Sequence, residues 1–297
     1  ALGLLFDLPL VVGALVTTVV STAMLFVQDR RSQRAFERVI TSLLVVVAIG
    51  FLTSLVLSPP DPAAAVAGLA PRLAGADSAL LAVGMLGATV MPHAVYLHSA
   101  LVRDRHGMAD EHRAHSLLRA IRLDVVLAMV LAGGVNISML LLSASALFGL
   151  DVVGLPEAHV AYAGEVGPGV ALLFAVALLA SGLASTSVGG YAGAVIMAGL
   201  LRRRIPLIWR RVITAVPALL LLAAGLDATR LLIISQVVLS FGIPFALLPL
   251  VRIAADRELM HLIPTRRLTL GLAWVVIALV IGLNATLLVL TAGEALA

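Results

Sequence analysis

Three residues with metal-binding or helix-breaking chemistry follow one another in a long apolar stretch: Met91, Pro92 and His93. Proline lacks a backbone N–H and clashes with the carbonyl four residues earlier, so a helix that reaches Pro92 kinks or breaks just before it. Gly84 and Gly87 weaken the preceding turns. A break would free backbone carbonyls beside a thioether and an imidazole, which together suit soft or borderline metal ions. The segment therefore predicts a transition-metal site at a broken helix.

An ordinary proline kink, with Met91 as a packing residue, is the simplest alternative. His93 argues against it, because a histidine at mid-membrane depth is costly and by default functional. His98 lies five residues further on, about 140° around a helix axis, so the two histidines do not share a face.

The composition places this segment in a membrane. Of 297 residues, 61% are apolar and 12% are charged, and the mean hydropathy is +1.12. A soluble domain has about 25% charged residues, so a single soluble core is excluded. The chain has no cysteine, which excludes a disulfide framework, a thiolate zinc site and an iron–sulfur cluster. The net charge of +4 gives no signal for nucleic acid, because the basic residues are all arginines of the connectors.

Continuous apolar stretches predict an all-α integral membrane protein with about eight transmembrane helices, arranged as one domain over 1–297. The broken helix at 79–103 would have two halves of roughly 18 Å each, which together just cross a bilayer. The predicted spans are 3–27, 39–57, 79–103, 123–149, 168–201, 211–226, 231–251 and 268–292.

Arginines lie almost entirely in alternate connectors, after the first, third, fifth and seventh predicted spans. Only Arg72 and Arg230 lie on the other side. Because cytoplasmic loops are rich in arginine and lysine, these four connectors are predicted to be cytoplasmic and both chain ends external. The Pro- and Ala-rich stretch 58–77 is predicted to be an external loop with one surface helix. We therefore expect a multi-pass protein of a cell membrane, and the arginine-only, Ala-rich composition suggests a GC-rich prokaryotic genome.

The segment GATVMPHAVYLHSAL at 87–101 resembles the sixth-helix signature of the Nramp family of proton-coupled divalent metal transporters. Four other segments are similar to the family's fourth, eighth, ninth and tenth helices, in the same order. They are LLFDLPLVVGALVT at 4–17, ASGLASTSVGGYAGAVIMAGLL at 180–201, RIPLIWRRVITAVPAL at 204–219 and SQVVLSFGIPFALLPL at 235–250. The resemblance implies helices four to eleven of a LeuT-like inverted-repeat transporter fold.

The resemblance also implies a set of metal ligands. In this family the sixth-helix methionine and a carbonyl three residues before it hold the ion, and they correspond to Met91 and Ala88. Thr89 would be a supporting polar residue. A tenth-helix glutamine that approaches the ion matches Gln236, and a seventh-helix asparagine matches Asn136. Either amide could instead be an ordinary hydrogen-bonding group between membrane helices.

For the proton route, His93 matches a histidine that the family associates with it, and His98 matches a second one. The titration range of histidine suits this role. Arg210 and Arg211 match paired ninth-helix arginines of a charged network that leads to the cytoplasm. The preference of cytoplasmic helix ends for arginine accounts for the pair equally well.

The implied activity is proton-coupled symport of manganese or ferrous iron into the cytoplasm, with cadmium as a surrogate. The metal is cargo, so no cofactor is expected, and no obligate protein partner or enzymatic activity. The family's Asp and Asn ligands come from a DPGN motif in a broken first helix, and this sequence has no such motif. Its sixteen carboxylates lie in connectors, at termini or near helix ends. We therefore expect the chain to be the C-terminal portion of a transporter with three further helices before Ala1.

Three other interpretations remain open. A transporter of the same architecture for an amino acid or another organic solute would give no reason for the Met91–His93 segment. An inactive fragment that lacks the first three helices is the second. An intramembrane metalloenzyme would use His93 and His98, but the sequence has neither an HExxH pattern nor a nucleophile elbow.

Overall fold

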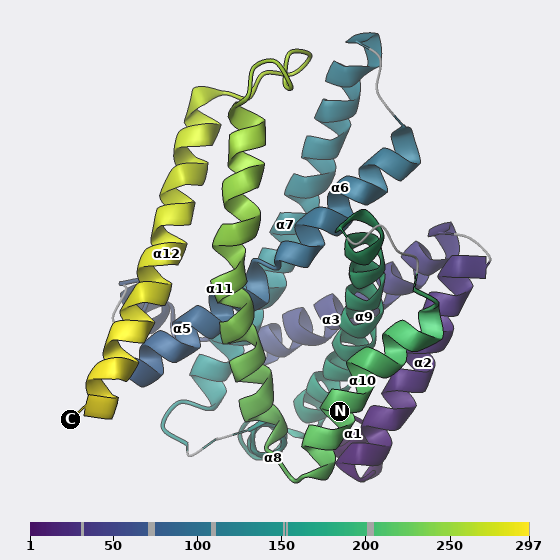
Figure 1. Cartoon of the computed structure of the whole chain (residues 1–297). Coiled ribbons are helices and arrows are strands. Elements are labelled where there is room, and N and C mark those ends of the chain that lie inside the picture. The colour runs from purple at the N-terminus through teal and green to yellow at the C-terminus, as the bar shows by residue number, and fades with distance from the viewer. Residues whose placement is uncertain are drawn as a thin grey trace. The chain divides into compact units, whose positions relative to one another are not determined.

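A computed structural model shows the chain as a set of helices joined by short connectors (Figure 1). It describes residues 1–30, 33–70, 75–107, 111–150, 152, 154–200 and 205–296, and these residues include no strand. The predicted connector charges at Arg31, Arg72 and 202–204 lie outside the described residues. The helices are α1 (Leu2–Phe6), α2 (Leu10–Arg30), α3 (Gln33–Leu57), α4 (Pro62–Ala67), α5 (Ala76–Thr89), α6 (Pro92–His106), α7 (Glu111–Ala146), α8 (Leu155–Glu165), α9 (Pro168–Leu200), α10 (Leu207–Ala223), α11 (Ala228–Ala255) and α12 (Arg267–Leu296).

The chain divides into two compact units. Unit 1 consists of Ala1–Ala70 and Leu123–Leu226, and unit 2 of Pro71–Arg122 and Asp227–Ala297. Each unit combines two segments that are far apart in the sequence, and each has its own apolar core.

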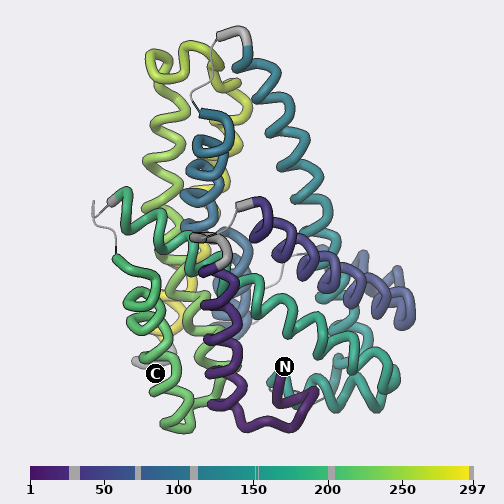
Figure 2. The backbone as a smooth tube through the Cα atoms, turned by 90° about the vertical axis from the view of Figure 1, so that its right-hand side faces the viewer, coloured from purple at the N-terminus to yellow at the C-terminus, as the bar shows by residue number. Residues whose placement is uncertain are grey.

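The core of unit 1 forms where α3, α7 and α8 pack against α9. Gly50 of α3 allows a close approach, since a Cβ there would lie 3.0 Å from the Cβ of Ala177 on α9. The rings of Phe51 and Phe174 meet edge to face, with their centroids 6.3 Å apart. Helix α2 lies beside both α9 and α10 (Figure 2).

Helix α8 was not predicted, because its eleven residues are too few to span a bilayer and lie within a predicted connector. A proline in its first turn and Glu157 favour the start of a helix there. Tyr162 is 2% exposed and packs on Phe174, with 5.1 Å between the ring centroids. Its hydroxyl lies 2.9 Å from the hydroxyl of Ser143 on α7. Burial raises the pKa of the Tyr162 phenol above its ordinary value, and the Ser143 hydrogen bond opposes this shift. Tyr162 therefore anchors α8 to the core of unit 1.

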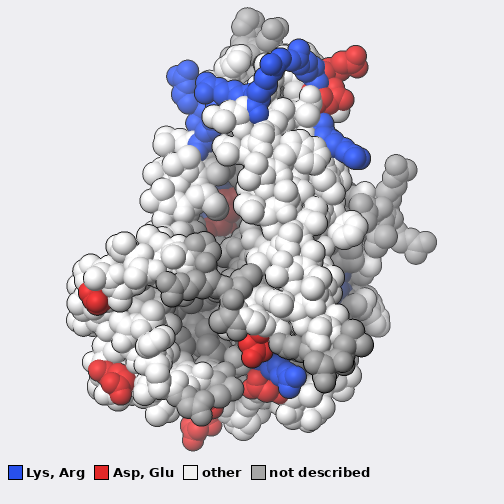
Figure 3. Space-filling view, turned by 90° about the vertical axis from the view of Figure 1, so that its left-hand side faces the viewer, with Lys and Arg blue, Asp and Glu red and all other residues white. Residues whose placement is uncertain are grey.

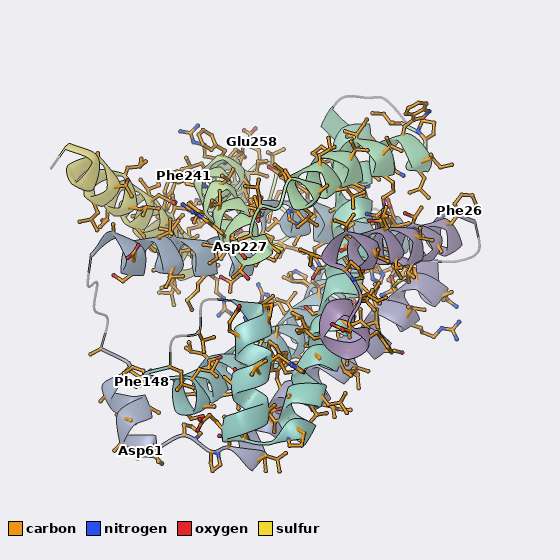
Figure 4. The ribbon with its side chains drawn as sticks, turned by 90° about the horizontal axis from the view of Figure 1, so that it is seen from below. Phe26, Asp61, Phe148, Asp227, Phe241 and Glu258 are labelled. Carbon is orange, nitrogen blue, oxygen red and sulfur yellow. The ribbon has the colours of Figure 1, made fainter. Side chains whose placement is uncertain are left out.

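The core of unit 2 forms where α5, α11 and α12 meet. Ala79, Val83, Val237 and Leu287 are its buried members, and Phe241 packs against them (Figure 4). Asp227 caps α11 by accepting the Arg230 N–H at 2.6 Å. Four exposed arginines lie at or beside the connection between α11 and α12, where Figure 3 shows basic side chains gathered at one end of the visible face. They are Arg252, Arg257, Arg266 and Arg267.

The eight predicted spans correspond to α2, α3, α5 together with α6, α7, α9, α10, α11 and α12. Among the described helices, six are long and apolar enough to cross a membrane. The first predicted span, 3–27, is interrupted at Asp7, whose φ is 53°. Leu8 precedes Pro9 and so disfavours helical backbone, and α2 begins after this proline, at Leu10. The predicted span 211–226 corresponds to α10, which has only 17 residues.

Two other boundaries also differ from the prediction. Helix α7 begins at Glu111, well before residue 123, because nothing in the arginine-rich stretch ahead of that residue stops a helix. The predicted surface helix within 58–77 is confirmed as α4, which begins at Pro62 because Asp61 caps it (Figure 4). The Asp61 carboxylate accepts the N–H groups of Ala63 and Ala64 at 3.1 and 3.3 Å.

The anchoring role of Tyr162 leads to a first prediction. Tyr162→Ala removes a buried ring and should destabilise the docking of α8 by about 3 kcal/mol. Tyr162→Phe keeps the ring and should cost only the hydroxyl hydrogen bond, about 1 kcal/mol. Hydrogen exchange of the α8 amides measures both changes, and Tyr96→Ala on the exposed side of α6 is the control. Equal loss of protection in the Ala and Phe variants would show that the ring does not anchor α8.

Candidate metal site

The apolar segment that carries Met91 is broken as predicted. Helix α5 ends at Thr89 and helix α6 begins at Pro92. Between them, Met91 has extended backbone, with φ −81° and ψ 115°. Extended backbone is what the residue before a proline prefers. Pro92 itself fits the first turn of a helix, where no N–H is needed.

Pro92 also determines which carbonyl the break leaves free. A helical carbonyl accepts the N–H of the residue four positions later, and for Ala88 that residue is Pro92, which has no N–H. Ala88 is exposed. The Thr89 hydroxyl turns back into α5, where it donates to the carbonyls of Met85 and Leu86 at 2.9 and 3.1 Å. The carbonyl of Ala88 is therefore an available acceptor, three residues before the Met91 thioether.

Helix α11 passes this break at close range because α5 carries glycines on the contacting face. A Cβ on Gly87 would overlap the carbonyl oxygen of Gln236 and lie 3.1 Å from the backbone nitrogen of Ser240. One turn earlier, a Cβ on Gly84 would make ordinary contact with Val237, at 3.7 Å. Helix α5 continues past both glycines to Thr89, so neither ends the helix, and both serve as contact points with α11.

The side chain of Gln236 is half-buried, and its two polar atoms differ in environment. Its Nε2 lies 3.5 Å from the Ser235 hydroxyl, whereas its Oε1 is buried and has no hydrogen-bond partner in the described structure. A buried amide oxygen without a donor is unfavourable. A cation would be a suitable partner for it. The structure thus brings the backbone of Gln236 against Gly87 of α5, which precedes Ala88 by one residue, and its ligand role stays a prediction.

The two candidate histidines lie on different faces of α6. His93 is half-buried, and the buried residues Leu97 and Ala100 follow it at helical spacing, four and seven residues on. His98 is exposed. His93 therefore lies on the packed face of α6 next to the break, and His98 does not.

The other predicted site residues belong to unit 1. Asn136 is exposed on α7, and Arg210 and Arg211 are half-buried on α10. The Arg211 guanidinium lies against α9, where it donates to the carbonyl of Thr186 at 3.4 Å. A Cβ on Gly190 would lie 3.3 Å from its Cζ. The Nε atoms of both arginines are buried without a hydrogen-bond partner among the described residues.

Two buried polar residues beside Gln236 were not predicted. Ser240 is fully buried on α11, and Asn284 is 5% exposed on α12. The available signal was Pro244, four residues after Ser240, together with a single asparagine in the last apolar stretch. Over the described ranges, no three His, Asp or Glu side chains are grouped closely enough to hold a metal ion. The candidate ligands at the break are therefore the Met91 thioether and the free carbonyl of Ala88, and the Gln236 amide oxygen lies on the helix that contacts α5.

The close contact at Gly87 gives a second prediction. Gly87→Ala would push a methyl group into the α11 backbone, so it should lower the free energy of unfolding by about 1–3 kcal/mol. Gly84→Ala is the matched control, because its methyl group meets its nearest neighbours at ordinary van der Waals distance and alanine favours helices. Thermal unfolding in detergent compares the two variants. Similar unfolding temperatures for both would contradict the contact.

Comparisons with known proteins agree with this geometry. The model of the Nramp family, described as natural resistance-associated macrophage protein-like, matches residues 1–290. The divalent metal cation transporter MntH of Mycobacterium tuberculosis is 53% identical over 293 residues, which are 98% of this chain and 68% of that protein. MntH of Bacillus subtilis is 41% identical over 97% of this chain and 69% of its own length.

Among solved structures, the manganese transporter of Eremococcus coleocola, in complex with an aromatic bis-isothiourea substituted compound, has a TM-score of 0.74 to this chain. It is 28% identical, and the match covers 95% of this chain and 65% of that one. This likeness confirms the LeuT-like fold that the sequence predicts. On the family match over nearly its whole length and the identity to MntH proteins, the chain belongs to the Nramp family of divalent metal transporters.

Proposed function

We propose that this multi-pass membrane protein transports divalent transition-metal ions, with manganese and ferrous iron as its cargo and protons as the coupled ion. The observation that carries the proposal is the free carbonyl of Ala88 beside the thioether of Met91. The identity to MntH proteins supports the same cargo class. The chain covers about two thirds of the length of these relatives, so the activity proposed is that of the full-length protein.

The ends of the two half-helices bear on where a cation would lie. The last carbonyls of α5 carry partial negative charge, whereas the first N–H groups of α6 carry partial positive charge. A cation is therefore favoured at the α5 end of the break, where the Ala88 carbonyl lies. Gln236 adds an amide oxygen from α11, the helix that contacts this end of α5. Discontinuous membrane helices hold coupled ions in this way in secondary transporters.

Met91 would provide selectivity. Carbonyl and amide oxygens also suit calcium and magnesium, which prefer oxygen ligands. A thioether adds little for these hard ions but coordinates softer ones, and so it can discriminate between them. A free-energy difference of about 1.4 kcal/mol would already give a tenfold difference in relative affinity.

The selectivity role of Met91 gives a third prediction. In the full-length protein reconstituted in liposomes, Met91→Ala should weaken cadmium uptake most and manganese uptake less, and should increase calcium uptake relative to both. The ratio of cadmium uptake to calcium uptake should fall by about tenfold or more, and a tenfold change corresponds to a free-energy difference of about 1.4 kcal/mol. Flux assays with paired metals measure this ratio.

Met85→Ala is the matched control for this experiment, because Met85 is 55% exposed on α5, before the break. It should leave the ratio unchanged. A packing role for Met91 would instead produce a cavity and a uniform fall in all metal fluxes. If cadmium and calcium uptake fall by the same factor in Met91→Ala, the selectivity role is wrong.

Proton coupling gives a fourth prediction. Because His93 lies on the packed face of α6 beside the break, His93→Ala should lower the proton influx per transported metal ion by about tenfold. This effect is smaller than is usual for a positioned proton-transfer group, because other groups can share the route. His98→Ala should have a smaller effect, since His98 is exposed. A pH-sensitive dye and a metal-sensitive dye in the same liposomes give the ratio of the two fluxes. An unchanged ratio in His93→Ala would remove His93 from the proton route.

A further inference from the structure

A second proline in unit 2 removes a backbone donor, this time inside an unbroken helix. Pro244 lies within α11, which continues on both sides of it. The carbonyl four residues earlier belongs to Ser240, and Pro244 has no N–H to donate to it. Ser240 is fully buried, so water does not solvate this carbonyl. An unpaired buried carbonyl would be costly.

Asn284 of α12 provides the missing donor. Its Nδ2 donates to the Ser240 carbonyl at 3.3 Å and to the carbonyl of Val280 at 3.0 Å. Both contacts need an N–H group, so they determine the orientation of the amide. The interaction joins two helices across 44 residues of sequence. The turn of α11 that Pro244 deprives of a donor is therefore hydrogen-bonded to α12.

The same turn of α11 contacts α5 at the metal site. Gly87 meets the carbonyl of Gln236 and the backbone nitrogen of Ser240, at the two ends of this turn. The Nδ2 of Asn284 donates a hydrogen bond to the carbonyl of Ser240. The turn that carries the Gln236 side chain therefore lies between a steric contact with α5 and a hydrogen bond from α12. A change in the course of α11 at this turn would move Gln236 relative to the Ala88 carbonyl.

Pro92 and Pro244 leave their freed carbonyls in opposite states. The carbonyl that Pro92 frees, at Ala88, is on an exposed residue at the break. The carbonyl that Pro244 frees, at Ser240, is buried and hydrogen-bonded by Asn284.

We propose that Asn284 is a positioning residue for metal binding: its hydrogen bond to the Ser240 carbonyl holds the turn of α11 before Pro244 and thereby keeps Gln236 at the break. The consequence for metal uptake rests on the proposed function, whereas the consequence for the position of residue 236 does not.

A double-mutant cycle tests the positional part. Asn284→Leu removes the donor, and Pro244→Ala restores a backbone N–H that can serve the Ser240 carbonyl. Because the chain has no cysteine, Gln236→Cys gives a single thiol whose reaction rate with a water-soluble methanethiosulfonate reagent reports its position. Asn284→Leu should change this rate by about fivefold or more with Pro244 present, within the usual coupling of residues in contact. In the Pro244→Ala background the change should be small, because Asn284 is no longer needed.

Two controls separate this mechanism from general destabilisation. Thr286→Val removes a hydroxyl that bonds only the Gly282 carbonyl of its own helix, so it should leave the thiol rate unchanged. Pro249→Ala alters α11 one turn after Pro244 and should not suppress the effect of Asn284→Leu. Hydrogen exchange of residues 240–248 in the cysteine-free chain repeats the cycle without any label. An equal effect of Asn284→Leu on both proline backgrounds, or no effect on either, would overturn the inference.

Metal uptake by the full-length protein tests the functional part. Asn284→Leu should raise the KM for cadmium by about fivefold or more and change the maximal rate less, since lost ligand positioning weakens binding. Pro244→Ala should suppress this increase. If the unmodified protein transports no divalent metal, the proposed function fails, and the thiol cycle still decides whether Asn284 positions residue 236. If metal is transported but the cycle shows no coupling, only the positioning role fails.

Discussion

The missing N–H of proline is the constraint on which the site depends. In a membrane, backbone polar groups must find partners within the protein, because the surrounding lipid offers none. Pro92 ends one helix and starts another, which leaves the carbonyl of Ala88 without a helical donor beside Met91. Pro244 remains inside a continuous helix, and there a side chain from α12 replaces the lost donor. The donor missing at Pro92 leaves the Ala88 carbonyl as a candidate ligand. The donor missing at Pro244 is replaced by a hydrogen bond from Asn284.

A second constraint is the small size of Gly87. Because no Cβ stands between α5 and α11, the two backbones touch at the turn that begins with Gln236. This contact brings the backbone of Gln236 to the end of α5 that precedes the break. A helix that is remote in sequence thereby lies beside the segment that carries the other candidate ligands, residues 88 to 91.

Unit 1 uses different means to pack its helices. Aromatic rings from α3, α8 and α9 meet in its core, and the Tyr162 hydroxyl bonds Ser143 of α7. Arg210 and Arg211, the two candidate proton-route arginines, are charged residues in apolar surroundings. Their Nε atoms are buried and have no hydrogen-bond partner in the part of the chain that the structure describes. The Arg211 guanidinium finds one carbonyl of α9. These Nε atoms lie in the interior of the unit, which positive-inside topology alone would not require.

The sequence by itself determined the all-helical membrane fold, the break before Pro92 and the family, because apolar length, proline chemistry and a contiguous motif are local properties. The site residues that it predicted remain predictions, although the free carbonyl of Ala88 already follows from proline spacing. Only the tertiary structure decided that Gly87 is a contact point, that α8 docks through Tyr162, and that Asn284 serves the carbonyl freed by Pro244. It also showed by burial that His93, and not His98, lies on the packed face of α6. These features depend on which helices become neighbours, and that results from packing across many residues of sequence, which no local pattern encodes.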